Sequence, residues 1–211
     1  ARDARYQAVL PVRGKSINAY KTKAAKLMQN AEVQMMIKAL GAGWSKDFNV
    51  DKMRYSRVIF ATDADYDGYH IQDLLLLIFW TLFKPAVDSG RVYISIPPLY
   101  EIKMRGVDKI IPIVTDSDLE EFKKKQLLDG KKENKDYTVN RNKGLGEDEA
   151  DVLWDTMLDP KNRLLKQIDS KDLESIASSL NVTMGDDTDI RKEWISSTAE
   201  GVDEDDLNNI G

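Results

Sequence analysis

The chain has 211 residues, of which 42% are hydrophobic and 32% are charged, a composition typical of a soluble globular protein with one sizeable core. It contains no cysteine, which excludes a disulfide framework and a thiolate metal site. Its most apolar stretch, Leu74–Phe83, is far shorter than the roughly 20 residues of a membrane-spanning helix. We therefore expect a cytoplasmic protein without membrane contact.

Charge is distributed unevenly along the chain. The formal net charge is −5, which by itself argues against a nucleic-acid-binding protein. Residues 1–62 nevertheless hold 12 Lys and Arg against 4 Asp and Glu, a charge of +8, which leaves −13 for residues 63–211. This distribution favours a basic surface for an anionic partner about as strongly as it favours chance clustering of charge on a solvated face.

The first half of the chain alternates between strand-like and helix-like patterns. Gln7–Val12, Arg57–Thr62 and Arg91–Ile96 are short apolar runs that predict strands. Apolar residues repeat every four positions within Lys21–Leu40, and Ile71–Phe83 is largely apolar, so both stretches predict helices. Strands that alternate with helices in this way predict an α/β fold with a parallel sheet.

Beyond the third predicted strand the pattern changes. Ile102–Val114 holds two strand-like runs that predict a hairpin, and Asp116 is the expected N-cap of a helix that continues to about Gln126. A further helix is expected from about Asp148. The acidic residues 200–211 have the composition of a disordered tail.

An acidic cluster follows the second predicted strand. Asp63, Asp65 and Asp67 alternate over five residues, and in an extended chain this spacing points all three carboxylates to one side. Like charges this close repel each other unless a cation holds them, and oxygen ligands suit Mg²⁺. Gly68 then allows a sharp turn into the next helix. Because α/β sheets place their sites at the carboxyl ends of strands, we expect a metal site here.

Other interpretations of the local motifs are weaker. An EF-hand loop would need a Glu at its twelfth position, which here is Leu74. A P-loop ending in Gly14-Lys15-Ser16 would need a Gly where Val9 stands. An acidic surface turn without a ligand remains open for the three aspartates taken alone. The only histidine, His70, follows the acidic cluster, and this position favours contact with a substrate.

A series of motifs runs in order along nearly the whole chain. It consists of Arg2-Asp3 with Gln7–Asn18, then Tyr55–Ile71, then Gly90–Tyr93 with Pro97–Tyr100, then Arg141–Glu147 with Leu153-Trp154 and Met157–Pro160, and finally Met184–Asp187 with Arg191. Together these motifs closely resemble the B-type subunit of type IIA DNA topoisomerases, the family of bacterial gyrase B and its topoisomerase IV counterpart.

The resemblance implies a Toprim domain, a Rossmann-like α/β domain that binds Mg²⁺ in a two-metal or moving-metal site. This site supports transesterification between a DNA phosphate and a tyrosine of the partner A-type subunit. By position, Asp63, Asp65 and Asp67 match the catalytic metal-binding triplet. The positions that match contacts to double-stranded DNA, or could assist them, are Arg13, Lys15, Asn18, His70 and Lys143.

The resemblance also divides the chain. Residues 1–115 are expected to form the Toprim core, residues 116–199 the rest of Toprim with an α-rich tail segment, and residues 200–211 the acidic tail. The family's catalytic Glu and the first Toprim strand are expected upstream of Arg2. ATP is expected to bind an ATPase segment or subunit outside this chain, so the isolated chain should be inactive.

Two alternatives remain open at this point. Primases and nucleases with a Toprim domain share the acidic triplet but lack motifs like Pro11–Lys15 and Lys143–Glu147. A Toprim fragment that only binds DNA, assists assembly or inhibits a topoisomerase would contain all of these motifs. Assays of DNA cleavage with and without an A-type subunit would separate the catalytic from the non-catalytic interpretation.

Overall fold

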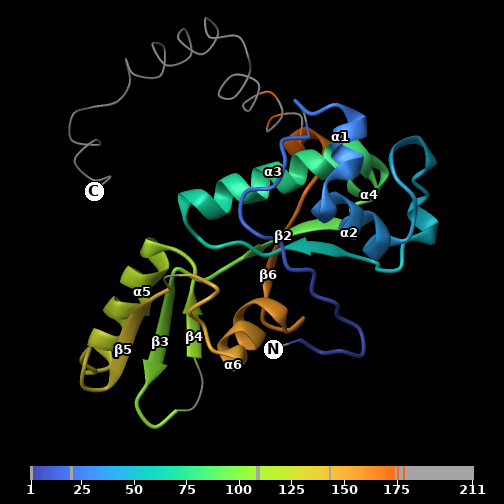
Figure 1. Cartoon of the computed structure of the whole chain (residues 1–211). Coiled ribbons are helices and arrows are strands. Elements are labelled where there is room, and N and C mark those ends of the chain that lie inside the picture. Colours follow the sequence, from blue (N-terminus) through green and yellow to red (C-terminus); the bar gives the residue numbers. More distant parts are fainter. Residues whose placement is uncertain are drawn as a thin grey trace, which may run out of the picture.

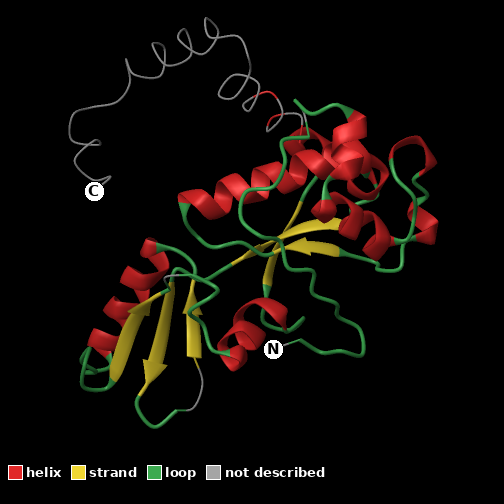
Figure 2. Ribbon diagram, viewed as in Figure 1, coloured by secondary structure: helices red, strands yellow, loops and turns green. Residues whose placement is uncertain are grey.

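The structure is a computed structural model that describes residues 2–19, 21–107, 110–142, 144–173, 175 and 178. Several sequence predictions lie outside the described residues. They concern Lys143, the motif Met184–Asp187 with Arg191, and the acidic tail at residues 200–211. Figure 1 labels the elements of the described part, and Figure 2 shows its helices and strands.

The first of two sheets in the described part confirms the predicted α/β class. Its three strands, β1 (Val58–Phe60), β2 (Val92–Ile96) and β6 (Leu164–Gln167), lie in the order β1-β2-β6. β1 and β2 are parallel, with Val58 opposite Val92, and both were predicted from their β-branched, apolar sequence. β6 was not predicted and pairs with β2 in the antiparallel direction.

The predicted strand at Gln7–Val12 is wrong. This segment is irregular, and no strand of the described part pairs with it. The side chain of Gln7 instead donates a hydrogen bond to the backbone oxygen of Leu158, 2.7 Å away. The apolar residues of this segment therefore belong to neither sheet of the described part.

Four helices pack around this sheet. The predicted helix within Lys21–Leu40 is divided into α1 (Ala24–Gln29) and α2 (Ala31–Leu40), because Asn30 has an extended backbone and caps α2 through Val33 N. The apolar helix is α3 (Tyr66–Leu82), followed directly by α4 (Lys84–Asp88) with a proline in its first turn. Two short 3₁₀ turns, η1 (Ser45–Asp47) and η2 (Val50–Lys52), lead from α2 to β1.

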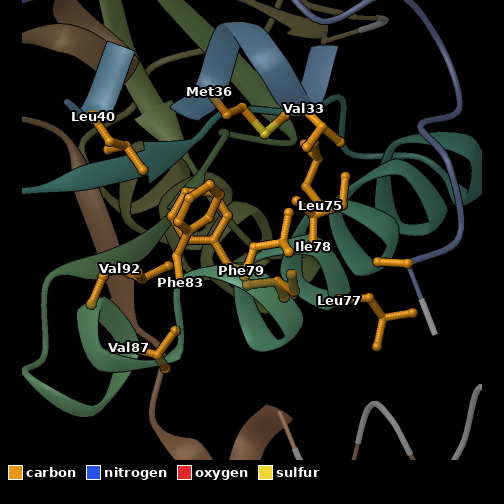
Figure 3. Packing of buried hydrophobic residues seen from close by; sticks show 14 of the residues in the cluster. Val33, Met36, Leu40, Leu75, Leu77, Ile78, Phe79, Phe83, Val87 and Val92 are labelled. Carbon is orange, nitrogen blue, oxygen red and sulfur yellow. The ribbon is translucent and has the colours of Figure 1, made fainter. Parts of the chain in front are cut away.

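The core of this unit lies where α2 and α3 meet the sheet. Figure 3 shows Val33 and Met36 of α2 facing Leu75 and Ile78 of α3. Deeper in the core, aromatic rings contact one another at centroid distances of 5.0 Å for Phe60–Phe79, 4.9 Å for Phe79–Phe83 and 5.5 Å for Phe48–Phe83. α3 is buried nearly all round in its second half, which explains its continuous apolar sequence.

A second sheet contains β3 (Tyr100–Met104), β4 (Ile110–Ile113) and β5 (Tyr137–Arg141), all antiparallel, in the order β4-β3-β5. β3 and β4 form the predicted hairpin. The helix α5 (Asp116–Leu128) covers one face of this sheet (Figure 1), where Leu119 and Phe122 pack against Ile102.

Several helix boundaries differ from those predicted. α3 begins at Tyr66, five residues before the predicted Ile71, because Asp65 caps it. The N-cap of α5 is Thr115, not Asp116, because Thr115 and Asp118 form a reciprocal capping box. The helix expected from about Asp148 begins at Ala150 as α6 (Ala150–Leu153) and continues as the π-helix η3 (Trp154–Leu158). In the described part of the chain, no helix combines the length and the apolar character that crossing a membrane requires.

The aromatic contacts make Phe83 a test of the core. Its side chain is fully buried against Phe79 and Phe48. We expect Phe83→Ala to lower the free energy of unfolding by about 3–5 kcal/mol, measured by urea denaturation. Leu128→Ala, at a side chain that is 88% exposed, should change it by less than about 0.5 kcal/mol. Similar effects of the two substitutions would contradict this core assignment.

Candidate metal and DNA-binding site

Asp63 and Asp65 line one cleft at the carboxyl end of β1. The cleft has a volume of about 220 Å³, and three segments far apart in the sequence contribute to its walls. The first is the turn after β1. The second is the segment after β2, with Pro97 and Leu99, and the third is the end of β5, with Arg141, and the loop that follows it. The cleft therefore lies at the edge where a parallel pair of strands ends, as the sequence predicted.

Asp63 is held by the loop that follows β5. Its Oδ1 atom accepts a hydrogen bond from the backbone N–H of Leu145 at 2.8 Å. A Cβ built on Gly144 would lie 3.6 Å from the Asp63 carboxylate, an ordinary van der Waals distance, so space alone does not require glycine here. The backbone φ of Gly144 is +155°, a value that side-chain-bearing residues rarely adopt. The Gly-Leu-Gly motif thus places a backbone donor on a carboxylate 82 residues earlier in the chain.

The three aspartates do not alternate along an extended chain. Asp65 is the N-cap of α3, and its Oδ1 accepts a hydrogen bond from Gly68 N at 2.6 Å. Asp67 already lies in the first turn of α3, where its Oδ1 pairs with Lys15 Nζ at 2.9 Å. The prediction that period-two spacing directs all three to one side is therefore wrong, because the helix begins within the motif.

Gly68 is required for a different reason from the one predicted. It lies inside α3 and has no positive φ, so it makes no sharp turn. A Cβ built on Gly68 would lie only 2.2 Å from the backbone oxygen of Asp63. The absent side chain allows the start of α3 to pack directly on the backbone of Asp63, which brings Asp63 and Asp65 to one cleft.

Lys15 lies in a loop that Glu32 of α2 holds in place. The two carboxylate oxygens of Glu32 accept hydrogen bonds from Arg13 N at 3.0 Å and from Ser16 Oγ at 2.8 Å. Between these anchors, Gly14 has a φ of +66° and turns the chain. Sequence reasoning missed Glu32, since nothing local links it to a loop 16 residues earlier.

Lys15 and His70 both lie beside Asp67. The Lys15 ammonium holds the pKa of Asp67 below its ordinary value, and the nearby charge of His70 acts in the same direction. His70 is half-buried on α3, and Arg13 has an exposed side chain. Asn18 is farther along the loop, where its side chain accepts a hydrogen bond from Lys21 N at 3.2 Å.

Two further acidic residues, Asp148 and Glu101, border the acidic cluster of Asp63, Asp65 and Asp67. Burial raises the pKa of Asp148, the Asn142 side chain opposes this shift, and the negative charge of Asp63 adds to it. Glu101 of β3 is buried, and its Oε1 atom has no hydrogen-bond partner. Burial raises the pKa of Glu101, the charge of Asp148 raises it further, and Lys103 opposes the shift. Sequence reasoning did not assign a role to either residue.

The donor set in the cleft suits a hard cation held by few protein ligands. No three His, Cys, Asp or Glu side chains of the described residues are grouped closely enough to hold a metal ion together. Mg²⁺, however, commonly binds through one or two carboxylates and keeps several waters. Asp63 and Asp65 each use one oxygen, Oδ1, for a backbone hydrogen bond. Asp63 and Asp65 therefore suit such a cation better than Asp67, which does not line the cleft and pairs with Lys15.

The close packing at Gly68 can be tested by adding one methyl group. We expect Gly68→Ala to lower the free energy of unfolding by about 1–3 kcal/mol, because backbone atoms of Asp63 must move. Thermal or urea denaturation measures this loss. Gly146→Ala is the matched control, since an added Cβ there contacts nothing within 4 Å. Equal stability of the two variants would contradict the packing described.

The buried carboxyl of Glu101 predicts a dependence on pH. A carboxyl with a raised pKa in the folded state contributes full stability below its ordinary pKa of 4.5, and this contribution is lost as pH rises through the folded value. We therefore expect Glu101→Gln to stabilise the protein by about 1 kcal/mol at neutral pH and to have little effect near pH 4. Urea denaturation at both pH values, with the exposed Glu121→Gln as control, should show this difference; a gain that is independent of pH would contradict it.

Two family models match the sequence. Residues 1–97 match the model described as Toprim domain, and residues 134–196 match the model described as DNA gyrase B subunit, carboxyl terminus. The first match contains β1, the acidic cluster and the Lys15 loop, and the second contains β5 and the Gly-Leu-Gly motif. The two segments that meet at Asp63 therefore come from the two matched regions.

Curated relatives match nearly the whole chain. It is 41% identical over 206 residues to the B subunit of DNA topoisomerase 4 from Bacillus subtilis (strain 168), covering 96% of this chain and 30% of the relative. It is 40% identical over 201 residues to the B subunit of DNA topoisomerase 4 from Streptococcus pneumoniae serotype 4, covering 94% and 30%. To the B subunit of DNA gyrase from Spiroplasma citri it is 40% identical over 201 residues, covering 95% and 30%.

The chain thus spans about 30% of the length of the curated relatives that it matches. Within this chain, the similarity covers nearly every residue and so extends over both matched regions. The chain therefore belongs to the family of type IIA DNA topoisomerase B-type subunits and carries a Toprim domain and a gyrase B carboxyl-terminal region.

Proposed function

We propose that this chain supplies the Mg²⁺-binding Toprim part of an ATP-dependent type IIA DNA topoisomerase, in which duplex DNA is cut and rejoined. The observation that carries this proposal is the cleft that Asp63 and Asp65 line at the carboxyl end of β1. Lys15 lies near it, because its ammonium pairs with Asp67 of the same acidic cluster. The names of the relatives, which are B subunits of DNA topoisomerase 4 and of DNA gyrase, support the same reaction.

In this proposal Asp63 and Asp65 hold the cation. The N–H groups of Leu145 and Gly68 each bind one oxygen of these carboxylates, so the other oxygen remains available to a cation in the cleft that both residues line. When bound, Mg²⁺ stabilises charge on the scissile phosphate and on the leaving 3′ oxygen. The attacking oxygen belongs to a tyrosine of an A-type subunit, so both proteins are needed for cleavage and for the reverse reaction.

The protein's own cations orient the DNA backbone in this scheme. Lys15 and Arg13 neutralise phosphate charge, and Glu32 keeps the loop that carries them in one position. Asn18 and His70 extend the contact along the backbone. Lys143 is proposed for the same role by its place in the sequence. None of these contacts reads base edges, so cleavage should show little sequence preference.

The proposed partners are double-stranded DNA, an A-type subunit with the tyrosine, and a segment or subunit with the ATPase. The test is relaxation of supercoiled plasmid by this chain combined with those partners, in the presence of Mg²⁺ and ATP. Asp65→Asn is the informative variant, because Asn retains a side-chain oxygen that can cap α3 while the charge is removed.

We expect Asp65→Asn to unfold at the same urea concentration as the wild type and to lose at least about 100-fold in relaxation rate, of the order seen when one catalytic electrostatic group is removed. Asp51→Asn, at an exposed residue of η2, should retain full activity. Full activity of Asp65→Asn would overturn the metal assignment. A wild-type assembly that binds DNA and never relaxes it would favour a binding or assembly role.

A further inference from the structure

We propose that Tyr66 and Tyr69 form an aromatic surface that packs against the deoxyribose atoms of bound duplex DNA. The aromatic surface, defined as the side chains of these two residues, lies in the first turns of α3 (Tyr66–Leu82). This inference rests on the proposed function, since it requires that DNA lies over the acidic cluster. It adds a contact of a different physical kind, because an aromatic ring binds by burial and not by charge.

The exposure of these rings is unusual. Tyr66 is 83% exposed and Tyr69 is 53% exposed, whereas the apolar residues in the second half of the same helix are buried. Among the large apolar and aromatic side chains of the described residues, only Leu128 is more exposed than Tyr66. Aromatic side chains that protrude next to a site commonly mark a surface that is covered by a partner.

Helix geometry places the aromatic surface next to His70. Residues three and four positions apart share one face of an α-helix, so Tyr66 lies on the same face as Tyr69 and His70. Gly68 lies on the opposite face, where it packs against the backbone of Asp63. A duplex that contacts His70 on this face would therefore also lie beside Tyr66 and Tyr69.

The charges around these rings favour DNA over a protein as the partner. Tyr66 stands between Asp65 and Asp67 in the sequence, and Asp67 is paired with Lys15. The cation proposed for Asp63 and Asp65 would neutralise that wall of the cleft, and the loop that carries Lys15 and Arg13 supplies two cationic side chains. Proteins that bind single-stranded nucleic acid without reading its sequence combine cationic side chains with aromatic rings, and on a duplex the apolar surface that such rings can reach is the deoxyribose edge.

The dependence of DNA affinity on salt concentration distinguishes the aromatic contact from the charged contacts. The full chain is titrated against a fluorescein-labelled DNA duplex of mixed sequence, with Mg²⁺, over a range of salt concentrations. We expect the double variant Tyr66→Ala/Tyr69→Ala to bind at least about fivefold more weakly, with an unchanged slope of log K against log salt. Lys15→Gln should make that slope about 0.9 less steep, since one phosphate contact is lost.

Two matched variants complete the experiment. Tyr66→Phe/Tyr69→Phe keeps both rings and is expected to bind DNA within about twofold of the wild type, since the hydroxyls add little to packing. Leu127→Ala/Leu128→Ala removes two side chains that are 72% and 88% exposed on α5, and should leave DNA binding unchanged. Circular dichroism and urea denaturation confirm that each variant is folded.

The outcomes distinguish this inference from the function on which it rests. If Lys15→Gln changes the slope and the tyrosine-to-alanine variant binds like the wild type, the aromatic contact is overturned, the proposed function stands, and the rings are left as a surface for a protein partner. A loss in the phenylalanine variant equal to that in the alanine variant would overturn packing by the rings. A wild-type chain that does not bind the duplex, either alone or together with the A-type subunit, would overturn both proposals.

Discussion

The hydrogen bond from Leu145 N to Asp63 Oδ1 joins the two halves of the molecule at the site. Asp63 ends the segment that follows β1 in the first sheet, and Leu145 follows β5 of the second sheet. Each sheet has its own apolar core, and neither core by itself determines where the carboxylate points. This contact, in a loop where Gly144 adopts a φ of +155°, holds one carboxylate oxygen of Asp63 against the opposite wall of the cleft.

The elements that could be predicted are those whose pattern is local. β1 and β2 are continuous β-branched and apolar runs, and α3 is an apolar run too long for a strand. Each of these patterns lies within the element itself, so it can be recognised without knowing which other elements it contacts. β6 could not be predicted, because Leu164–Gln167 has no alternating pattern and becomes a strand only by pairing with β2. Gln7–Val12 shows the opposite error, since an apolar run remains irregular when no strand pairs with it.

The candidate site shows the same difference between local features, which could be predicted, and long-range contacts, which could not. The acidic motif and the Lys15 loop could be located from the sequence, because residue types and spacing carry that information. Their geometry could not, because α3 begins at Tyr66 and turns Asp67 away from the side of Asp65. The supporting contacts from Glu32 and Leu145 cross 16 and 82 residues and leave no local trace. Sequence therefore identified the chemistry, and long-range packing determined which two carboxylates share the cleft.

The ion pair between Lys15 and Asp67 makes the protein a competitor for its own proposed ligand. The Lys15 ammonium, which is proposed to contact a phosphate, is engaged by the Asp67 carboxylate at 2.9 Å. Both side chains are largely exposed, so the pair is easily exchanged for other partners. A phosphate that binds Lys15 would therefore have to displace Asp67, and the affinity of this lysine for a phosphate would be lower than that of an unpaired lysine by the small free energy of an exposed ion pair.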